Sequence, residues 1–399
     1  MATGTQKLRT SRSLTGTRAV LFAAAVLAMI SLLVVWLVIR IGLAKPVDTH
    51  VSVLQTLIEG SAYGPDVTAE QLLILADKQS QWMLDAFPNS ASAYNLTANR
   101  DYLTGNLEGA RANWSRALEL DPRSSEAFFG LSLIAFEASD YERAIELGEQ
   151  CRLINLGNPR VPLLLAESYL QNDQTDKAVL VLFQHIATEP TSVQALELLG
   201  NAFLNTREYD RAVTQFKRVL TFAPKSKDAH YGLAQAFAKL GDKEQAKLFK
   251  EKFDELSKDT GANHQQDARS FKDQAYAAHI AAQVFADSAM IYKQREDFKN
   301  AADCLLRAQK LQPDVVTWLA ELQRSFYSLT KLREAADVGE RLVQLDPKSV
   351  DNWLTLGQIY SDLQMPDAAL AAFEQAVELA PDDDRCRRAQ AVLTELRLK

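Results

Sequence analysis

The side chains best suited to chemistry are thinly spread along this chain. Cysteine and histidine act as nucleophiles, bases or metal ligands when their spacing brings them together. None of the cysteines forms a C-x-x-C pair, and no phosphate-binding glycine loop, H-E-x-x-H or G-x-S-x-G motif occurs. We therefore expect no catalytic, cofactor or metal site, and free thiols within the packing of the fold. The residues concerned are Cys151, Cys304, Cys386, His50, His185, His230, His264 and His279.

The charge of the chain is unevenly distributed. Its 399 residues carry a formal net charge of −7, yet residues 1–18 hold four basic side chains and no acidic one. The rest of the chain is therefore strongly acidic. An acidic body repels phosphates, so we expect no nucleic-acid partner.

An apolar segment follows the basic tail. Residues 19–39 read AVLFAAAVLAMISLLVVWLVI and contain no charge, and about 20 helical residues span the hydrocarbon core of a bilayer. The segment predicts a transmembrane helix over 19–40. A cleaved signal peptide is the alternative, with Gly42-Leu43-Ala44 as small residues for cleavage.

The flanks of this segment predict its orientation. Basic residues dominate before it, whereas Asp48, Glu59 and Asp66 follow it together with Arg40 and Lys45. The positive-inside bias then makes residues 1–18 a cytoplasmic tail. Residues 41–56 become a linker, and the large body lies outside the cytoplasm, in the periplasm if the source is bacterial.

Prolines reveal a repeat in the remaining chain. Seven of the twelve prolines form a series with successive separations of 34, 68, 34, 89, 34 and 34 residues, and each follows a predicted helix. These are Pro88, Pro122, Pro190, Pro224, Pro313, Pro347 and Pro381. Aligned on them, eight repeats begin at Ala91, Ser125, Pro159, Val193, Lys227, Ala282, Val316 and Val350.

Two positions of the repeat carry small residues. All eight repeats have alanine at the twentieth position, and all but one have Ala, Ser or Gly at the eighth; the exception is Gln323. The last repeat adds Trp353, Tyr360 and Phe373 at helical spacing. This pattern resembles the tetratricopeptide-repeat (TPR) family. The resemblance implies an all-α, right-handed superhelical α-solenoid of paired helices, which a single transmembrane helix would precede.

Departures from the pattern divide the chain. Residues 57–90 fit the register but contain Gly60, Gly64 and Pro65, so we interpret them as a degenerate first repeat. Gln323 predicts that its helix pair splays apart. The resulting segments are an N-terminal TPR stack of the degenerate repeat plus five (57–260), a helical insertion and joint (261–281), a C-terminal stack of three repeats (282–383) and a capping helix (384–399).

The resemblance also implies a binding surface. In TPR stacks the first helices line a concave groove, so certain positions of each repeat face a partner. An apolar strip lies among them, which either binds a partner or completes the core. The candidate groove residues are Asn95, Asn99, Tyr102, Phe129, Leu133, Phe136, Leu163, Glu167, Leu170, Asn201 and Tyr231.

Function follows from these expectations. We expect a membrane-tethered scaffold or adaptor that binds a protein or peptide segment in its groove, with a possible place in envelope protein assembly. The alternative is a regulatory subunit of a membrane enzyme or complex, and the oligomeric state stays open. We expect no enzymatic activity, because no reactive cluster is visible.

Overall fold

The computed structural model describes residues 67–155, 157–260 and 274–389, which all lie within one compact unit, Pro65–Lys399. Over these ranges the chain is all-helical and contains no strand. The predicted cytoplasmic tail (1–18), transmembrane helix (19–40) and linker (41–56) lie outside them. Among the described helices, none is long and apolar enough to cross a membrane.

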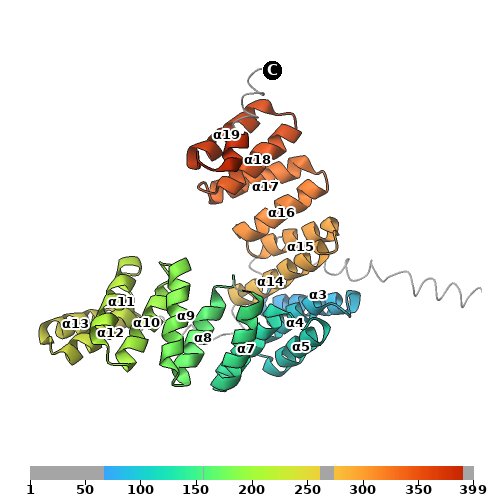
Figure 1. Ribbon diagram of the computed structural model, residues 1–399. Helices are drawn as coiled ribbons and strands as arrows, with labels where there is room; N and C mark the ends of the chain where they lie inside the picture. Colours follow the sequence, from blue (N-terminus) through green and yellow to red (C-terminus); the bar gives the residue numbers. More distant parts are fainter. Residues whose placement is uncertain (1–66, 156, 261–273, 390–399) are drawn as a thin grey trace, which may run out of the picture. The chain divides into compact units, whose positions relative to one another are not determined.

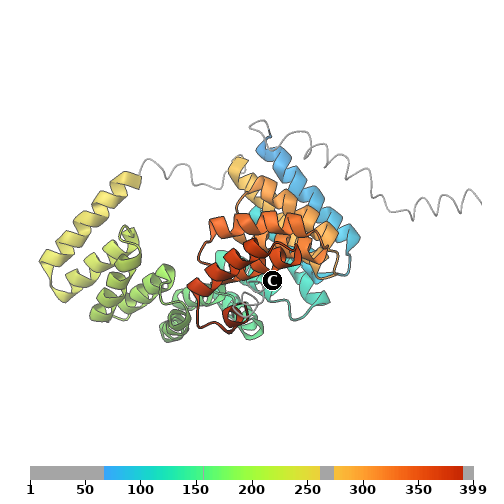
Figure 2. The ribbon, with the colours of Figure 1, turned by 90° about the horizontal axis from the view of Figure 1, so that it is seen from above.

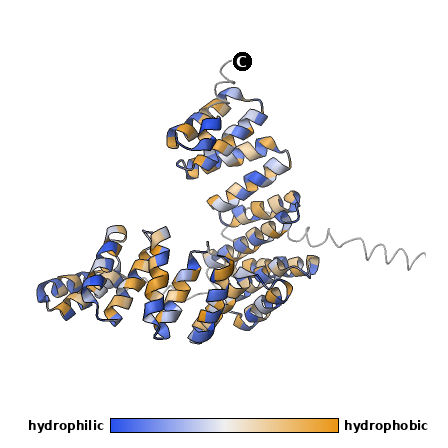
Figure 3. Cartoon of the chain, in the orientation of Figure 1, coloured by the Kyte–Doolittle hydropathy of each residue, from blue (hydrophilic) through white to orange (hydrophobic). Residues whose placement is uncertain are grey.

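The helices follow the predicted repeats. Helices α4 to α13 form five pairs, α14 to α19 form three, and each pair occupies one repeat (Figure 1). Hydrophobic and hydrophilic residues alternate around the helices (Figure 3), as packing on one face requires. The bounds are α3 Ala69–Ala86, α4 Ala91–Leu103, α5 Leu107–Leu120, α6 Ser125–Glu137, α7 Tyr141–Ile154, α8 Arg160–Gln171, α9 Thr175–Thr188, α10 Val193–Asn205, α11 Tyr209–Phe222, α12 Lys227–Leu240, α13 Lys243–Thr260, α14 Gln274–Lys293, α15 Phe298–Leu311, α16 Val316–Ser328, α17 Leu332–Leu345, α18 Val350–Asp362 and α19 Pro366–Leu379.

One tight turn recurs between the two helices of every repeat. The fifteenth residue has a left-handed backbone, and the next backbone N–H donates to the carbonyl of the eleventh residue. This hydrogen bond is the one that ends a helix in a Schellman motif. Glycine suits the position, yet only two repeats have it. The eight residues are Gly105, Ser139, Asp173, Arg207, Gly241, Glu296, Thr330 and Gln364.

The small residues allow close packing inside each pair. Seven of the eight alanines at the twentieth position are fully buried. The eighth, Ala246, is half-buried on α13. Glycine at the eighth position lies against a ring of the second helix: a Cβ on Gly200 would come within 2.7 Å of Phe216. These contacts explain the small-residue pattern, since a larger side chain would overpack the pair.

The prediction that Gln323 splays its helix pair is wrong. Gln323 is 3% exposed and lies between α16 and α17, which remain packed together. Gly339 on α17 makes the room, because a Cβ there would lie 2.4 Å from the Gln323 side-chain nitrogen. In this repeat the large side chain is on the first helix and the glycine is on the second, the reverse of the arrangement of Gly200 and Phe216. The two helices can therefore pack equally closely.

Helix α14 packs against helices that are far from it in the sequence as well as against its neighbour in the chain. It packs on α15, its partner in the repeat, and almost as extensively on α3, some 200 residues earlier. It also contacts α4. Figure 2 shows α3, in blue, next to α14, in gold. Helix α3 corresponds to the second helix of the degenerate repeat. Thus α14 takes the place of that repeat's first helix while serving as the first helix of its own.

Specific bonds hold α14 against α3. The side-chain nitrogen of Gln79 donates to Ser288 Oγ at 3.1 Å, and both residues are buried. Trp82 Nε1 donates to the hydroxyl of Tyr292 at 3.2 Å. The ring of Tyr292 also meets Phe87 edge-on at 5.5 Å. Polar groups therefore pair across this junction, as buried donors and acceptors require.

The C-terminal end continues in helical form. Residues 384–389 are helical, Cys386 is fully buried, and its Sγ donates to the carbonyl of Ala376. Ala389 packs with Phe373 in a small apolar cluster. The described part of the predicted capping helix thus covers α19, while residues 390–399 lie outside the description.

Candidate functional site

The first helices form one continuous face of the N-terminal stack. Helices α4, α6, α8 and α10 each contact the next first helix, so that the series ends at α12, and α14 contacts α4. The second helices α5, α7, α9 and α11 make no comparable contacts with one another among the described residues. We call the surface formed by α14, α4, α6, α8, α10 and α12 the inner face.

Hydrogen bonds cross the inner face from one repeat to the next. The ninth residue of one repeat pairs with the second residue of the following repeat, as Asn99 does in donating to Glu126 Oε1 at 2.5 Å. The side chain of Gln194 likewise donates to Glu167 Oε1 at 3.1 Å. Asn99 and Glu167 therefore contribute to stacking as well as to the surface.

A second set of bonds reaches the caps of neighbouring helices. Asn95, which is buried, donates to Ser124 Oγ at 2.9 Å. Ser124 in turn accepts from the Ala127 backbone N–H and caps α6. Ser226, the N-cap of α12, donates to Glu197 Oε1 at 2.5 Å. The polar part of the inner face is thus built around side chains that also fix the helix ends.

Two carboxylates, Asp287 on α14 and Glu126 on α6, lie near enough for the charge of Glu126 to affect Asp287. Burial, together with the nearby charge of Glu126, raises the pKa of Asp287 to about 7, although Gln283 donates a hydrogen bond to it at 2.8 Å. Burial also raises the pKa of Glu126, against hydrogen bonds from Asn99 and Asn95. The side chain of Glu126 reaches solvent, but the surrounding helices replace much of its water. No cation pairs with either carboxylate within the described residues.

Further along the face, burial raises the pKa of Glu197, and the charge of Asp228 adds to the effect. The hydrogen bond from Ser226 opposes it. The inner face thus carries negative charge that is held in partly desolvated surroundings, which favours a cationic partner group.

The predicted apolar strip is partly core. Phe129 is 9% exposed and belongs to the main apolar cluster, with the guanidinium of Arg160 4.8 Å from its ring centre. The other four residues are half-buried and pack against the same cluster. They therefore present some apolar area on the first helices α6 and α8; they are Leu133, Phe136, Leu163 and Leu170.

The remaining predicted groove residues differ in surroundings. Tyr102 is half-buried, and its hydroxyl donates to Glu137 at 2.5 Å. Asn201 on α10 is exposed. Tyr231 on α12 is 49% exposed, and its ring lies tilted against that of Phe253 of α13, with the ring centres 5.1 Å apart.

Sequence reasoning missed Asp287 and Gln283 as site residues. Their repeat lies far from the N-terminal stack in the sequence, and only the docking of α14 on α3 and α4 brings them beside Glu126. The alanine-rich character of α14 was the available signal, since small residues allow helices to approach on several sides.

Side chains that could hold a metal ion are not clustered in the described residues. Within them, no group of three or more His, Cys, Asp or Glu side chains could hold a metal ion. All three cysteines are free and buried, as the sequence predicts. Burial raises the pKa of Cys151 to about 11 and that of Cys304 to about 12.

Curated proteins with similar sequences are distant and longer than this chain. Human Protein O-mannosyl-transferase TMTC1 is 23% identical over 250 residues, which are 61% of this chain and 25% of the human protein. TPR repeat-containing protein YpiA of Bacillus subtilis is 25% identical over 161 residues, or 40% of this chain and 37% of YpiA. The chain spans well under half the length of each.

Solved structures resemble parts of the chain. YrrB, described as a TPR protein with an unusual peptide-binding site, has 22% identity and a TM-score of 0.41 over 45% of this chain and 93% of YrrB. A crystal structure of MamA has 16% identity and a TM-score of 0.39 over 47% of this chain and 96% of MamA.

Family comparisons agree with the repeats. Three family models, each described as a tetratricopeptide repeat, match much of the region that contains the helix pairs. The matched residues are 95–151 and 197–251, 135–202 and 328–393, and 282–315. The chain belongs to the tetratricopeptide-repeat family.

Proposed function

We propose that this protein is a scaffold whose inner face binds a segment of a partner protein that carries basic and apolar side chains. Tetratricopeptide-repeat proteins bind protein or peptide partners, and this membership supports the general role. The observation that carries the specific proposal is the pair formed by Glu126 and Asp287, beside half-buried apolar side chains.

The electrostatics favour a cationic group from the partner. A carboxylate whose pKa is raised by burial is short of stabilising charge, and a lysine or arginine placed beside it restores that stabilisation. The charge of Glu126 raises the free-energy cost of ionising Asp287, so a cation placed near both carboxylates would reduce that cost. A hydrogen bond to a charged group contributes about 1.5–3 kcal/mol.

Apolar area on the first helices α6 and α8 supplies the other half of the recognition. Leu133 and Phe136 lie on α6 with Glu126, and Leu163 and Leu170 lie on the neighbouring helix α8. All four are half-buried. A peptide that crosses these two helices could bury apolar side chains there while a basic residue reaches Glu126 and Asp287.

Site-specific photocrosslinking tests the choice of face. A photoreactive phenylalanine replaces Leu170 on the inner face in the full chain, expressed in its native cells. Its matched control replaces Leu180, which lies on the second helix α9 and is 59% exposed. The proposal expects a discrete protein adduct from position 170 and none from position 180. An adduct from position 180 alone would favour the alternative, a regulatory subunit that contacts a membrane enzyme through its second-helix surface.

We further propose that residues 19–40 tether the scaffold to a membrane, with the repeats outside the cytoplasm. The uncharged segment and the basic residues before it support this proposal. Such a scaffold would suit envelope protein assembly in a bacterium. Carbonate extraction should leave the protein in the membrane, and protease added to the periplasmic side of spheroplasts should digest the repeats. Release by carbonate would indicate a cleaved signal, and protected repeats would reverse the topology.

A further inference from the structure

The eleventh residue of the repeat has an aromatic ring in six of the eight units. The ring of Phe203 on α10, for example, lies 6.3 Å from that of Phe183 on α9, the second helix of the preceding repeat. Asp101 and Ala135 are the exceptions. The six ring-bearing residues are Tyr169, Phe203, Phe237, Tyr292, Phe326 and Tyr360.

The two exceptions differ in how their space is filled. Asp101 is buried, and its carboxylate accepts a hydrogen bond from Asn113 at 2.9 Å and another from Asn106 at 3.3 Å. Polar contacts thus occupy the place of the ring in that repeat. Ala135 carries only a methyl group, and a pocket of about 260 Å³ opens beside it.

Neighbouring repeats reveal what normally lies over the ring. In the next two repeats, the nineteenth residue is basic and stacks on it: Lys177 Nζ lies 5.4 Å from the ring centre of Tyr169, and the Arg211 guanidinium lies 3.9 Å from that of Phe203. The corresponding residue in the second repeat is Arg143, which lines the pocket beside Ala135. Arg143 therefore has the position for a cation–π contact but no ring beneath it.

Where the ring at the eleventh position is a tyrosine, the second helix of the preceding repeat can provide an acceptor for its hydroxyl. The hydroxyl of Tyr169 donates to Glu149 at 2.9 Å, and that of Tyr360 donates to Glu340 at 2.7 Å, each at the twenty-fifth position of the repeat before. The residue at that position before Ala135 is Ser115, which also lines the pocket. A hydroxyl acceptor is thus available where a tyrosine would need one.

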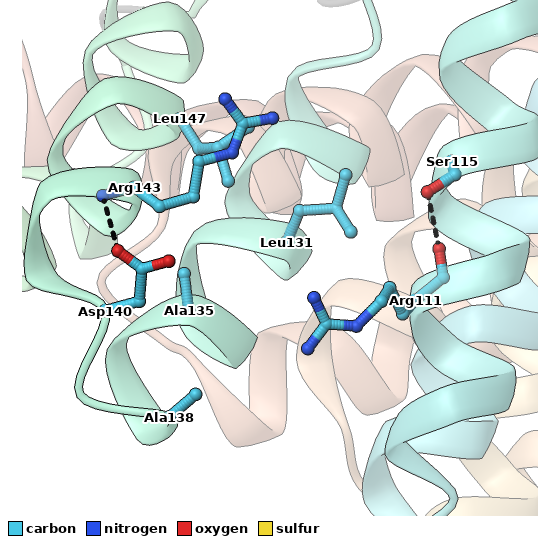
Figure 4. A pocket seen from close by; sticks show the side chains of 8 residues that line it. All are labelled: Arg111, Ser115, Leu131, Ala135, Ala138, Asp140, Arg143 and Leu147. Carbon is cyan, nitrogen blue, oxygen red and sulfur yellow. Dashed lines mark hydrogen bonds between the residues drawn. The ribbon is translucent and has the colours of Figure 1, made fainter.

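Figure 4 shows these groups around the opening. Leu131 and Ala135 from α6 and Leu147 from α7 provide the apolar surface. Arg111 extends from α5 toward α6, and Arg143 lies on the opposite side. Asp140 is also present, but its carboxylate accepts from the Arg143 backbone N–H as the cap of α7.

We propose that this pocket binds an aromatic side chain of a partner protein, with a carboxylate next to it in the partner. The ring would occupy the place left by Ala135, beneath Arg143, and restore the stack that the next two repeats make internally. The carboxylate would pair with Arg111, which is exposed and forms no ion pair within the described residues. The site lies between α5, α6 and α7 and is separate from the cation-binding carboxylates of the inner face.

Nuclear magnetic resonance with a small probe tests the proposal directly. The full-length protein carries ¹³C-labelled alanine and leucine methyl groups and is titrated with N-acetyl-tyrosine, which has both the ring and a carboxylate. We expect ring-current shifts at the methyl groups of Ala135, Leu131 and Leu147, with a dissociation constant in the range of about 1 mM. N-acetyl-tyrosinamide should bind several-fold more weakly and N-acetyl-leucine should produce no such shifts.

Two variants locate the site. Ala135→Phe places the missing ring within the chain and should abolish the probe shifts while keeping or raising the melting temperature. Arg111→Gln changes only an exposed residue and should remove the preference for N-acetyl-tyrosine over its amide. Absence of methyl shifts in the wild-type protein overturns the proposal even if Ala135→Phe fails to fold, and so do shifts that persist in a folded Ala135→Phe protein or a preference that survives Arg111→Gln.

Discussion

The junction between α14 and α3 rests on a buried polar pair whose removal has a calculable effect. Gln79 is 4% exposed, Ser288 is fully buried, and their side chains hydrogen-bond at 3.1 Å. Replacing Ser288 with alanine leaves the Gln79 side-chain nitrogen without its acceptor. An unsatisfied buried donor costs about 1–3 kcal/mol of folding free energy.

A double-mutant cycle separates this cost from the loss of the hydroxyl itself. Ser288 Oγ also donates to the carbonyl of Val284 within α14. Ser168 provides a matched control, because it is equally buried and bonds only to the carbonyl four residues earlier, Leu164. We expect Ser288→Ala to cost about 1 kcal/mol more than Ser168→Ala. Adding Gln79→Met to Ser288→Ala should recover most of that difference, since both partners are then apolar.

Urea unfolding of the full-length protein measures these differences. Circular dichroism follows all helices, and tryptophan fluorescence includes Trp82, which bonds to Tyr292 at the same junction. The slope of the transition should stay constant while its midpoint shifts. Equal costs for Ser288→Ala and Ser168→Ala, or no recovery in the double variant, would refute the view that α14 completes the first repeat through this pair.

Three further predictions concern other parts of the chain. Gly339→Phe should clash with Gln323 and cost about 1–3 kcal/mol of folding free energy. Adding Gln323→Ala should restore most of the melting temperature. A double variant that melts no higher than the single one would refute the view that Gly339 makes room for Gln323. Because the pKa of Asp287 is raised from 3.8 to about 7, the folded state holds its proton more tightly than the unfolded state does. The unfolding free energy should therefore fall between about pH 4 and pH 7 by an amount on the order of 1–3 kcal/mol; Asp287→Asn should lose that part of the pH dependence, and an unchanged profile would contradict the assignment. Cys151 and Cys304, with pKa values raised to about 11 and about 12, should resist iodoacetamide at pH 8 in the native protein and react in urea; rapid native labelling would show that they are accessible.

Much of the fold could be predicted from the spacing of a few residues. A proline that follows most of the second helices and an alanine that permits close packing are local requirements, so they recur in the sequence at a fixed interval. The packing of α14 on α3 has no such local mark. Ten of the fifteen residues from Ala277 to Ile291 in α14 are buried, on more than one side of the helix, so its pattern does not indicate which neighbours cover which side.

The candidate site was less predictable for a related reason. Position in the repeat indicates which side chains lie on the first-helix surface, but not which of them the stack uses for its own bonds. Asn95 and Asn99 occupy such positions and pair with neighbouring repeats. Phe129 occupies another and is core. Asp287 reaches the inner face only through a contact between distant segments.

The measurement that tests the central claim most directly is the affinity of the full-length protein for the partner identified by crosslinking from position 170. Glu126→Gln combined with Asp287→Asn removes both negative charges from the inner face while retaining similar volumes. The account predicts binding at least about tenfold weaker, since each lost charged contact is worth about 1.5 kcal/mol or more. It also predicts an undiminished melting temperature and a weaker dependence of binding on salt. Unchanged affinity in this double variant would contradict the claim that the inner face binds its partner through these carboxylates.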